Sequence, residues 1–242
     1  MSKDASRSSP FKNPLCIALD VDTDVRALEL FDQLKGLAGG FKLGPRLIHR
    51  YGQALVQKMA KESPIFVDCK FFDIPSTMEA AVRATFDSGA SLCTVHALAG
   101  AEALRGLAHL EKELNQKRPF RILAVTILTS WSEKSFPSNF KRQGLPKHVK
   151  DLAELVRDAG LHSVVCSPEE IDLLKDLGLY LLTPGIRLPS DSKSDQKRVM
   201  GPKEAMEKGA SALVVGRPII ESSNPQEAAR RYHLQFCVMA QQ

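Results

Sequence analysis

The sequence contains no long hydrophobic run, and none of its apolar stretches approaches the roughly 20 residues that cross a membrane as a helix. Residues 1–14, MSKDASRSSPFKNP, are polar and lack the apolar centre of a secretory signal peptide. The net charge of +5 is modest, and no basic tract concentrates it as nucleic-acid-binding proteins do. We therefore expect a cytoplasmic protein whose partners include neither a membrane nor a nucleic acid.

Cys-X-X-Cys pairs are also absent. The five cysteines, an odd count, stand at positions 16, 69, 93, 166 and 237. Four of them lie inside apolar runs, where a free thiol behaves as a small hydrophobic side chain. This pattern indicates free cysteines in a reducing compartment rather than a disulfide framework.

Short apolar runs rich in β-branched residues recur along the chain, and continuous runs of this kind are typical of strands buried on both faces. They are residues 15–20, 39–44, 64–70, 92–97, 121–128, 162–167, 179–185 and 212–217. Amphipathic stretches between them predict helices, and this alternation predicts an α/β fold, a (β/α)8 TIM barrel in a single domain. A doubly wound open sheet is the alternative, although no GxGxxG follows the first run. We assign residues 1–14 to a flexible N-terminal segment and residues 15–242 to the barrel.

Several helix boundaries are also marked in the sequence. Residues 167–170 (SPEE) combine an N-cap serine, a proline at the first helical position and a capping-box glutamate. Gly-Pro at 201–202 and Asn-Pro at 224–225 predict two further helix starts, and residues 76–79 (STME) predict a capping box. The polar segment 188–198 (LPSDSKSDQKR) predicts a mobile loop.

Charged residues gather where the predicted strands end. In FVDCKFFDIPST (66–77), Asp68 and Lys70 are two positions apart and share one side of a strand, whereas Asp73 lies in the following loop. Other predicted strands end with Asp20, Lys42, His96, Thr129, Ser130, Arg187 and Arg217. The C-terminal ends of barrel strands carry the active site in enzymes of this fold. We therefore interpret these residues as one site rather than as unrelated solvent-exposed strand ends.

These residues also carry a resemblance to a known family. The chain resembles orotidine 5'-phosphate decarboxylases of the bacterial type through ALD (18–20), FKLG (41–44), DCKFFDIPST (68–77), TVHA (94–97), TPGIR (183–187) and VVGRPI (214–219). The resemblance implies a homodimeric barrel that converts orotidine 5'-monophosphate to uridine 5'-monophosphate, the last step of de novo UMP synthesis. It also implies that no metal and no cofactor take part.

The resemblance assigns the catalytic roles to Lys42, Asp68, Lys70 and Asp73. Lys70 would protonate C6 of the pyrimidine, because a lysine ammonium both stabilises developing negative charge and carries a transferable proton. Burial alone would favour the neutral amine, and flanking carboxylates counter this effect. The four residues would form an alternating Lys-Asp-Lys-Asp network, with Asp73 contributed across a dimer interface.

The remaining assignments concern substrate binding. Asp20, Lys42 and Thr77 would bind the ribose hydroxyls, and Thr129 and Ser130 would bind the pyrimidine edge. Arg187, Gln196, Gly216 and Arg217 would hold the phosphate, with Arg217 making a bidentate contact.

Two alternatives and two departures stay open at this point. A sister branch of the family decarboxylates 3-keto-gulonate 6-phosphate with Mg²⁺, but it carries a glutamate where this chain has Lys42. A non-catalytic phosphate- or nucleic-acid-binding barrel would require a broken charge network or a basic stripe with exposed aromatics.

Phe72 stands where relatives have a histidine, and Leu98-Ala99 replaces a more polar pair. The roles of Phe72 and His96 are left unassigned.

Overall fold

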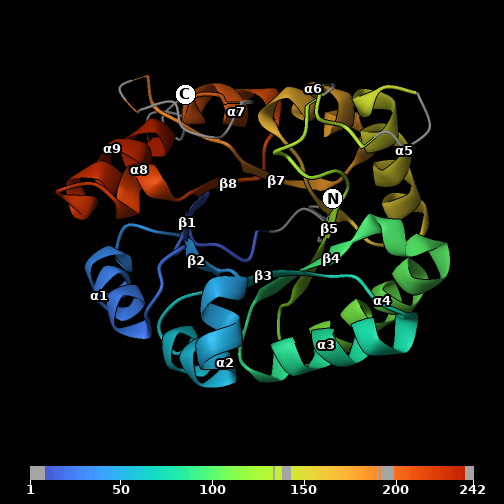
Figure 1. The fold of residues 1–242 in the computed structure, drawn as a ribbon, viewed down its shortest axis with the longest axis horizontal. Helices are drawn as coiled ribbons and strands as arrows, with labels where there is room; N and C mark the ends of the chain where they lie inside the picture. The colour runs from blue at the N-terminus through green and yellow to red at the C-terminus, as the bar shows by residue number, and fades with distance from the viewer. Residues whose placement is uncertain (1–8, 133, 138–142, 190, 192–198, 238–242) are drawn as a thin grey trace, which may run out of the picture.

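Parallel strands form a closed barrel surrounded by helices (Figure 1). The structure is a computed structural model that describes residues 9–132, 134–137, 143–189, 191 and 199–237. Its strands are β1 (Leu15–Ala18), β2 (Gly40–Leu43), β3 (Ile65–Phe71), β4 (Leu92–His96), β5 (Arg121–Val125), β6 (Ser163–Val165), β7 (Tyr180–Pro184) and β8 (Ala212–Val215). Pairing of β1 with β8 closes the sheet, which confirms the barrel and excludes the open doubly wound alternative.

The strands are buried on both faces, as their continuous apolar sequences predict. One set of alternating side chains fills the barrel interior, including Phe66, Val125 and Val214. The other set, including Ile17 and Phe41, packs against the surrounding helices. Two apolar layers therefore hold each strand in place, and the charged side chains of the site lie toward the C-terminal ends of the strands.

The helices follow the strands in the order expected for the fold. They are α1 (Asp24–Leu34), α2 (Pro45–Ala60), α3 (Pro75–Asp87), α4 (Gly100–Asn115), α5 (Leu145–Asp158), α6 (Ile171–Leu174), α7 (Pro202–Lys208), α8 (Arg217–Ile220) and α9 (Pro225–Cys237), with 3-10 turns η2 (Ala97–Ala99), η3 (Pro168–Glu170) and η4 (Lys175–Leu177). The predicted starts at Pro168, Pro202 and Pro225 are confirmed, and Ser167 with Glu170 forms the predicted capping box.

The capping box predicted at Ser76 and Glu79 is wrong. Helix α3 begins two residues earlier than that box requires, at Pro75, with Ile74 in the N-cap position and no side-chain cap. Proline has its φ already near the helical value, so Pro75 sets the start of the helix and leaves Ser76 inside its first turn.

The bottom of the barrel is covered by residues just before β1. Phe11 is 6% exposed and joins the interior cluster, and a Cβ at Gly40 would lie only 2.5 Å from its ring. Asn13 accepts a hydrogen bond from the Leu15 amide, and the Ser9 hydroxyl lies 3.0 Å from that of Tyr180. Residues 9–14, assigned above to a flexible segment, thus pack against the barrel, and residues 1–8 lie outside the described residues.

Two other predictions concern thiols and membranes. Cys16, Cys69, Cys93 and Cys166 are free, and all of these except Cys69 are buried, as the apolar runs predict. Throughout the described parts of the chain, every helix is too short or too polar to cross a membrane. Most of the loop predicted at 188–198, including Gln196, lies outside the described residues.

Candidate active site

A cavity of about 610 Å³ opens at the C-terminal ends of the strands. Its floor is apolar and comes from the barrel interior, including Phe66, Val125 and Val214. Its polar lining consists of Asp20, Lys42, Arg46, Asp68, Lys70, Thr129, Ser130, Arg187, Arg217 and Glu221. Most of the residues predicted from strand ends therefore do meet in one place.

Strand β3 is irregular where it carries the central charges. From Val67 to Phe71 the strand advances four residues while β4 advances two, from Cys93 to Val95, so β3 bulges here. Lys70 lies within this bulge with φ at 49°, and it is the one non-glycine residue in the described ranges with a positive φ. A left-handed conformation costs a non-glycine residue about 1–2 kcal/mol. Contacts around Lys70 must offset this cost, and they include the hydrogen bond from its backbone amide to the Thr94 hydroxyl.

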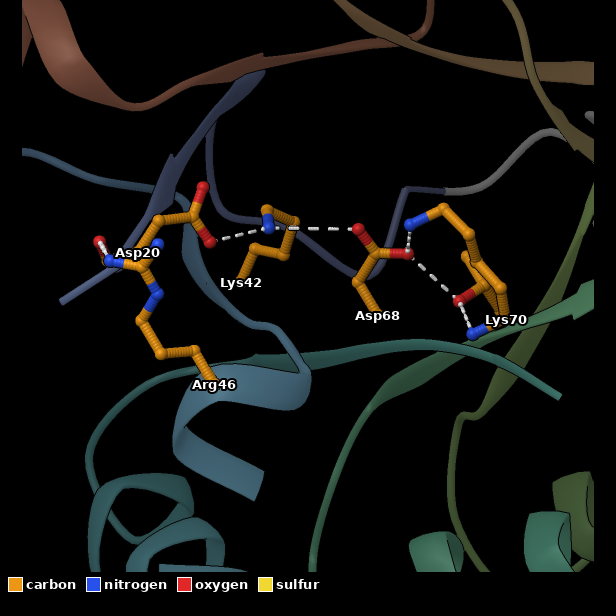
Figure 2. A network of polar contacts seen from close by, with 6 residues as sticks. Asp20, Lys42, Arg46, Asp68 and Lys70 are labelled. Carbon is orange, nitrogen blue, oxygen red and sulfur yellow. Dashed lines mark hydrogen bonds and ion pairs between the residues drawn. The ribbon is translucent and has the colours of Figure 1, made fainter. Parts of the chain in front are cut away.

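The charges alternate in sign across three strand ends (Figure 2). The ammonium of Lys42 lies 2.9 Å from Oδ1 of Asp20 and 3.6 Å from Oδ2 of Asp68. The other Asp68 oxygen, Oδ1, lies 2.8 Å from the ammonium of Lys70. Asp68 thus stands between two cations, and Lys42 stands between two anions.

Mutual attraction keeps these buried groups charged. Burial raises the pKa of Asp68, but attraction to Lys42 and Lys70 and hydrogen bonds from Lys70 and Thr94 outweigh it, so the pKa is lowered. Burial likewise lowers the pKa of Lys42, but attraction to Asp68 and Asp20 and a hydrogen bond to Asp20 leave it raised. At neutral pH Asp68 and Lys42 are therefore both ionised.

His96 lies at the same rim but outside the charge network. Burial and the nearby Lys70 ammonium lower the pKa of His96, so its ring is neutral at pH 7. Its Nδ1 accepts a hydrogen bond from the Leu98 amide, and its ring centroid lies 5.5 Å from that of Phe72. Among the described residues no three His, Cys, Asp or Glu side chains cluster as metal ligands would.

The cavity is also lined by arginines that follow the last two strands. Arg187 follows β7, is 9% exposed, and donates a hydrogen bond to the Ile186 carbonyl oxygen at 3.0 Å. Arg217 begins α8 directly after Gly216, where an added Cβ would lie 3.4 Å from Cβ of Ala18. These cations form a positively charged wall that suits an anionic group on a ligand.

Two predicted residues, Asp73 and Thr77, do not line this cavity in a single chain. Asp73 and Thr77 are exposed outside it, and the Asp73 carboxylate accepts a hydrogen bond from the Ile74 amide at 2.7 Å. Gln196 lies outside the described residues.

Sequence reasoning also missed residues that the structure places at the site. Arg46 donates to the Asp20 carbonyl oxygen at 3.4 Å, and Glu221 lines the cavity. Both residues lie shortly after the ends of β2 and β8. Their position close after a strand end is the sequence feature that could have predicted them.

The arrangement suits a reaction that develops negative charge on a bound anion. Lys70 offers a fixed ammonium that can stabilise such charge and donate a proton, and Asp68 holds it in place. Arg187 and Arg217 can bind a second anionic group in the same cavity. A phosphorylated substrate that passes through a carbanion fits both features.

Comparisons with known proteins agree with this chemistry. The profile of the family described as Orotidine 5'-phosphate decarboxylase / HUMPS matches residues 13–232. The chain is 38% identical over 217 residues to the orotidine 5'-phosphate decarboxylase of Legionella pneumophila, covering 88% of this chain and 94% of the relative. It is 39% identical over 225 residues to that of Carboxydothermus hydrogenoformans, covering 90% and 93%. The crystal structure of orotidine 5'-phosphate decarboxylase from Lactobacillus acidophilus has a TM-score of 0.81 at 30% identity, covering 93% of this chain and 99% of that one.

We predict that Lys42→Met lowers the free energy of unfolding by about 3 kcal/mol at pH 7, because it leaves Asp68 buried with one cation instead of two. The lowered pKa of Asp68 means that its stabilising contribution is present above the unfolded pKa of about 3.9 and is lost as pH falls through the folded value. The difference in free energy of unfolding between Lys42→Met and the parent protein should therefore become smaller below about pH 4. Urea denaturation at pH 7 and pH 3 measures it.

Lys35→Met is the matched control, because Lys35 pairs with Asp32 and Glu62 at the surface. Exposed pairs contribute about 0–1 kcal/mol, so this variant should stay close to the parent protein. A Lys42→Met deficit that is equal at both pH values would contradict the charge-pair explanation.

Proposed function

The chain belongs to the Orotidine 5'-phosphate decarboxylase / HUMPS family, and on that premise we propose how its site works on orotidine 5'-monophosphate. As in its curated relatives, the enzyme is a lyase of pyrimidine biosynthesis that removes a carboxylate. The alternating chain Asp20, Lys42, Asp68 and Lys70 is the observation that carries the mechanism.

The reaction breaks the bond between C6 and the carboxylate of the pyrimidine. Carbon dioxide leaves, the electron pair stays on C6, and a proton from the Lys70 ammonium then forms the new C6–H bond. Lys70 lies at the cavity wall with Asp68 holding its ammonium at 2.8 Å, so the charge that stabilises the transition state is already oriented. No electron acceptor is required, because the reaction is a redox-neutral exchange of carbon dioxide for a proton.

The rest of the cavity binds the nucleotide. Asp20 accepts hydrogen bonds from the ribose hydroxyls, and Lys42 donates a hydrogen bond to them. Thr129 and Ser130 contact the pyrimidine edge. Arg187, Gly216 and Arg217, which follow β7 and β8, hold the phosphate, and Gln196 is assigned to the same task. Binding energy from the phosphate, remote from C6, then lowers the barrier for the chemical step.

The active site is completed by a second copy of the chain. Asp73 and Thr77 are exposed outside the cavity of their own chain, and Phe72 and Ile74 beside them are 60% and 64% exposed. Apolar side chains of this size at the rim suit burial against a partner subunit. We therefore assign the catalytic Asp73 and the ribose contact of Thr77 to the partner's cavity in a symmetric homodimer.

The metal-dependent reaction of the sister branch fits these residues less well. Both oxygens of Asp68 face ammonium groups, and Lys42 occupies the position where that branch has a metal-binding glutamate. A divalent cation at Asp68 would lie against two positive charges.

The proposed reaction can be measured directly. The protein should convert orotidine 5'-monophosphate to uridine 5'-monophosphate, and the rate should be unchanged after exhaustive treatment with EDTA. Loss of the substrate's ultraviolet absorbance gives the rate. Turnover that EDTA abolishes and Mg²⁺ restores would favour the metal-dependent alternative, and no turnover in either condition would refute the proposed function.

Arg217→Ala should weaken phosphate binding. Removal of a charge-assisted contact typically costs about 2–5 kcal/mol, and the loss should appear in kcat/KM for the nucleotide but be much smaller for the unphosphorylated nucleoside. Arg46→Ala is the control, because Arg46 also lines the cavity but donates a hydrogen bond to the Asp20 carbonyl oxygen after β1. Arg46→Ala should lower kcat/KM by the same factor for the nucleotide and for the nucleoside. An equal loss of kcat/KM for both substrates in Arg217→Ala would show that Arg217 has no special role toward phosphate.

Mixed dimers test the shared site. Lys70→Ala and Asp73→Asn are each expected to be inactive, yet a heterodimer of the two contains one cavity with intact Lys42, Asp68, Lys70 and partner Asp73. Co-refolding differently tagged chains should restore activity, up to one working site per heterodimer.

The matching control pairs Lys70→Ala with Asp68→Asn. Both defects then lie in residues that each chain supplies to its own cavity, so neither cavity of that heterodimer is complete and activity should stay absent. Inactive heterodimers in the first pairing would place Asp73 in its own chain's site.

A further inference from the structure

Thr94 lies on β4, directly behind the charge network, and is fully buried. It shares the inward face of the strand with Leu92 and His96, because side chains alternate along a strand. Its hydroxyl oxygen lies 2.9 Å from the backbone nitrogen of Lys70 and 2.9 Å from Oδ1 of Asp68. One hydroxyl thus contacts the main chain of one catalytic residue and the side chain of the other.

The direction of both hydrogen bonds is determined by chemistry. The Lys70 amide can only donate and the Asp68 carboxylate can only accept, so the Thr94 oxygen accepts from the first and its single hydrogen goes to the second. No other proteinogenic side chain of the same shape offers this pair of contacts. Valine has the same branched outline but neither a donor nor an acceptor.

The contact falls where β3 leaves its regular register. Between Val67 and Phe71 the strand bulges away from the regular ladder with β4, and Lys70 takes its positive φ there. The Lys70 amide is held by a side chain of β4, since Thr94 supplies the acceptor. The hydroxyl therefore stabilises a backbone conformation that lysine would otherwise avoid.

We propose that Thr94 is a positioning residue for decarboxylation, which fixes the Lys70 backbone and the Asp68 carboxylate relative to each other. This inference rests on the proposed function and adds a residue that does not line the cavity. Through Oδ1 of Asp68, Thr94 directs the carboxylate so that its two oxygens face Lys70 and Lys42 separately. Without the hydroxyl, the carboxylate and the lysine backbone are each free to turn away from the reacting carbon.

A second consequence concerns protonation of Asp68. The hydrogen bond from Thr94 is among the interactions that lower the pKa of this carboxyl group. The titratable groups facing Asp68 are Lys42 from β2, Lys70 from β3, the thiols of Cys16 and Cys69, and Asp20 across Lys42. A substitution at Thr94 removes none of these groups but takes away one hydrogen bond to the ionised carboxylate, so it should raise the pKa of Asp68.

The test compares Thr94→Val with Thr94→Ser in the full-length protein, using orotidine 5'-monophosphate. Thr94→Val should lower kcat by roughly 10- to 100-fold, the range expected when a catalytic group is displaced by up to 1 Å. KM should change little, because the ribose and phosphate contacts are intact. Thr94→Ser keeps the hydroxyl and should retain most of the parent kcat. The acid limb of the kcat–pH profile should move to higher pH in Thr94→Val only.

Thr126→Val is the matched control. Thr126 follows β5 and is also fully buried, but its hydroxyl finds no hydrogen-bond partner among the residues that the structure describes. The same substitution there should leave kcat and the pH profile unchanged. Thermal unfolding of each variant shows how much of any loss comes from the fold.

The outcomes separate this inference from the proposed function. A parent protein that does not decarboxylate the nucleotide refutes the function, whereas an active parent with an unaffected Thr94→Val refutes only the role of Thr94. A Thr94→Ser defect as deep as that of Thr94→Val, or a loss confined to KM, also overturns it. If Thr94→Val fails to fold, Thr94→Ala lacks the same hydroxyl and replaces it, and failure of both to fold makes Thr94 a structural residue only.

Discussion

The site depends on one electrostatic balance, that of a nearly buried carboxylate between two ammonium groups. Burial of a carboxylate whose side chain is only 15% exposed favours its protonated form, and burial of a lysine whose side chain is 12% exposed favours its neutral amine. Because Asp68 and Lys42 are in each other's field, both remain ionised. Lys70 joins the same balance through Asp68, and so the group proposed to donate the proton is oriented before substrate arrives.

The barrel makes this balance possible by leaving polar side chains no other place. Both faces of every strand are covered by apolar layers, so charges appear only where the strands end. There β3 departs from regular geometry, and the positive φ falls on Lys70, the residue proposed to donate the proton. The local irregularity and the proposed catalytic role therefore fall on the same residue, as is common in strained active sites.

Much of this was predictable from sequence, and the limits have physical causes. The barrel and the cavity residues Asp20, Lys42, Asp68 and Lys70 follow from buried strands that end in charge. Thr94 was missed because its importance depends on the bulge in β3, which shifts the pairing between strands and leaves no mark in either sequence. The exposed position of Asp73 agrees with its assignment to a partner, but the single chain does not contain that partner.

The closure of the barrel between β1 and β8 has a consequence for how the protein is made. During synthesis the charge network can assemble once β4 has emerged, whereas Arg187 and Arg217 arrive only with the last strands. Pairing of β1 with β8 joins residues separated by almost the whole chain, so it is among the slowest contacts to form. Because Arg187 and Arg217 line the cavity together with residues that follow the first strands, the complete cavity requires the strand that closes the barrel.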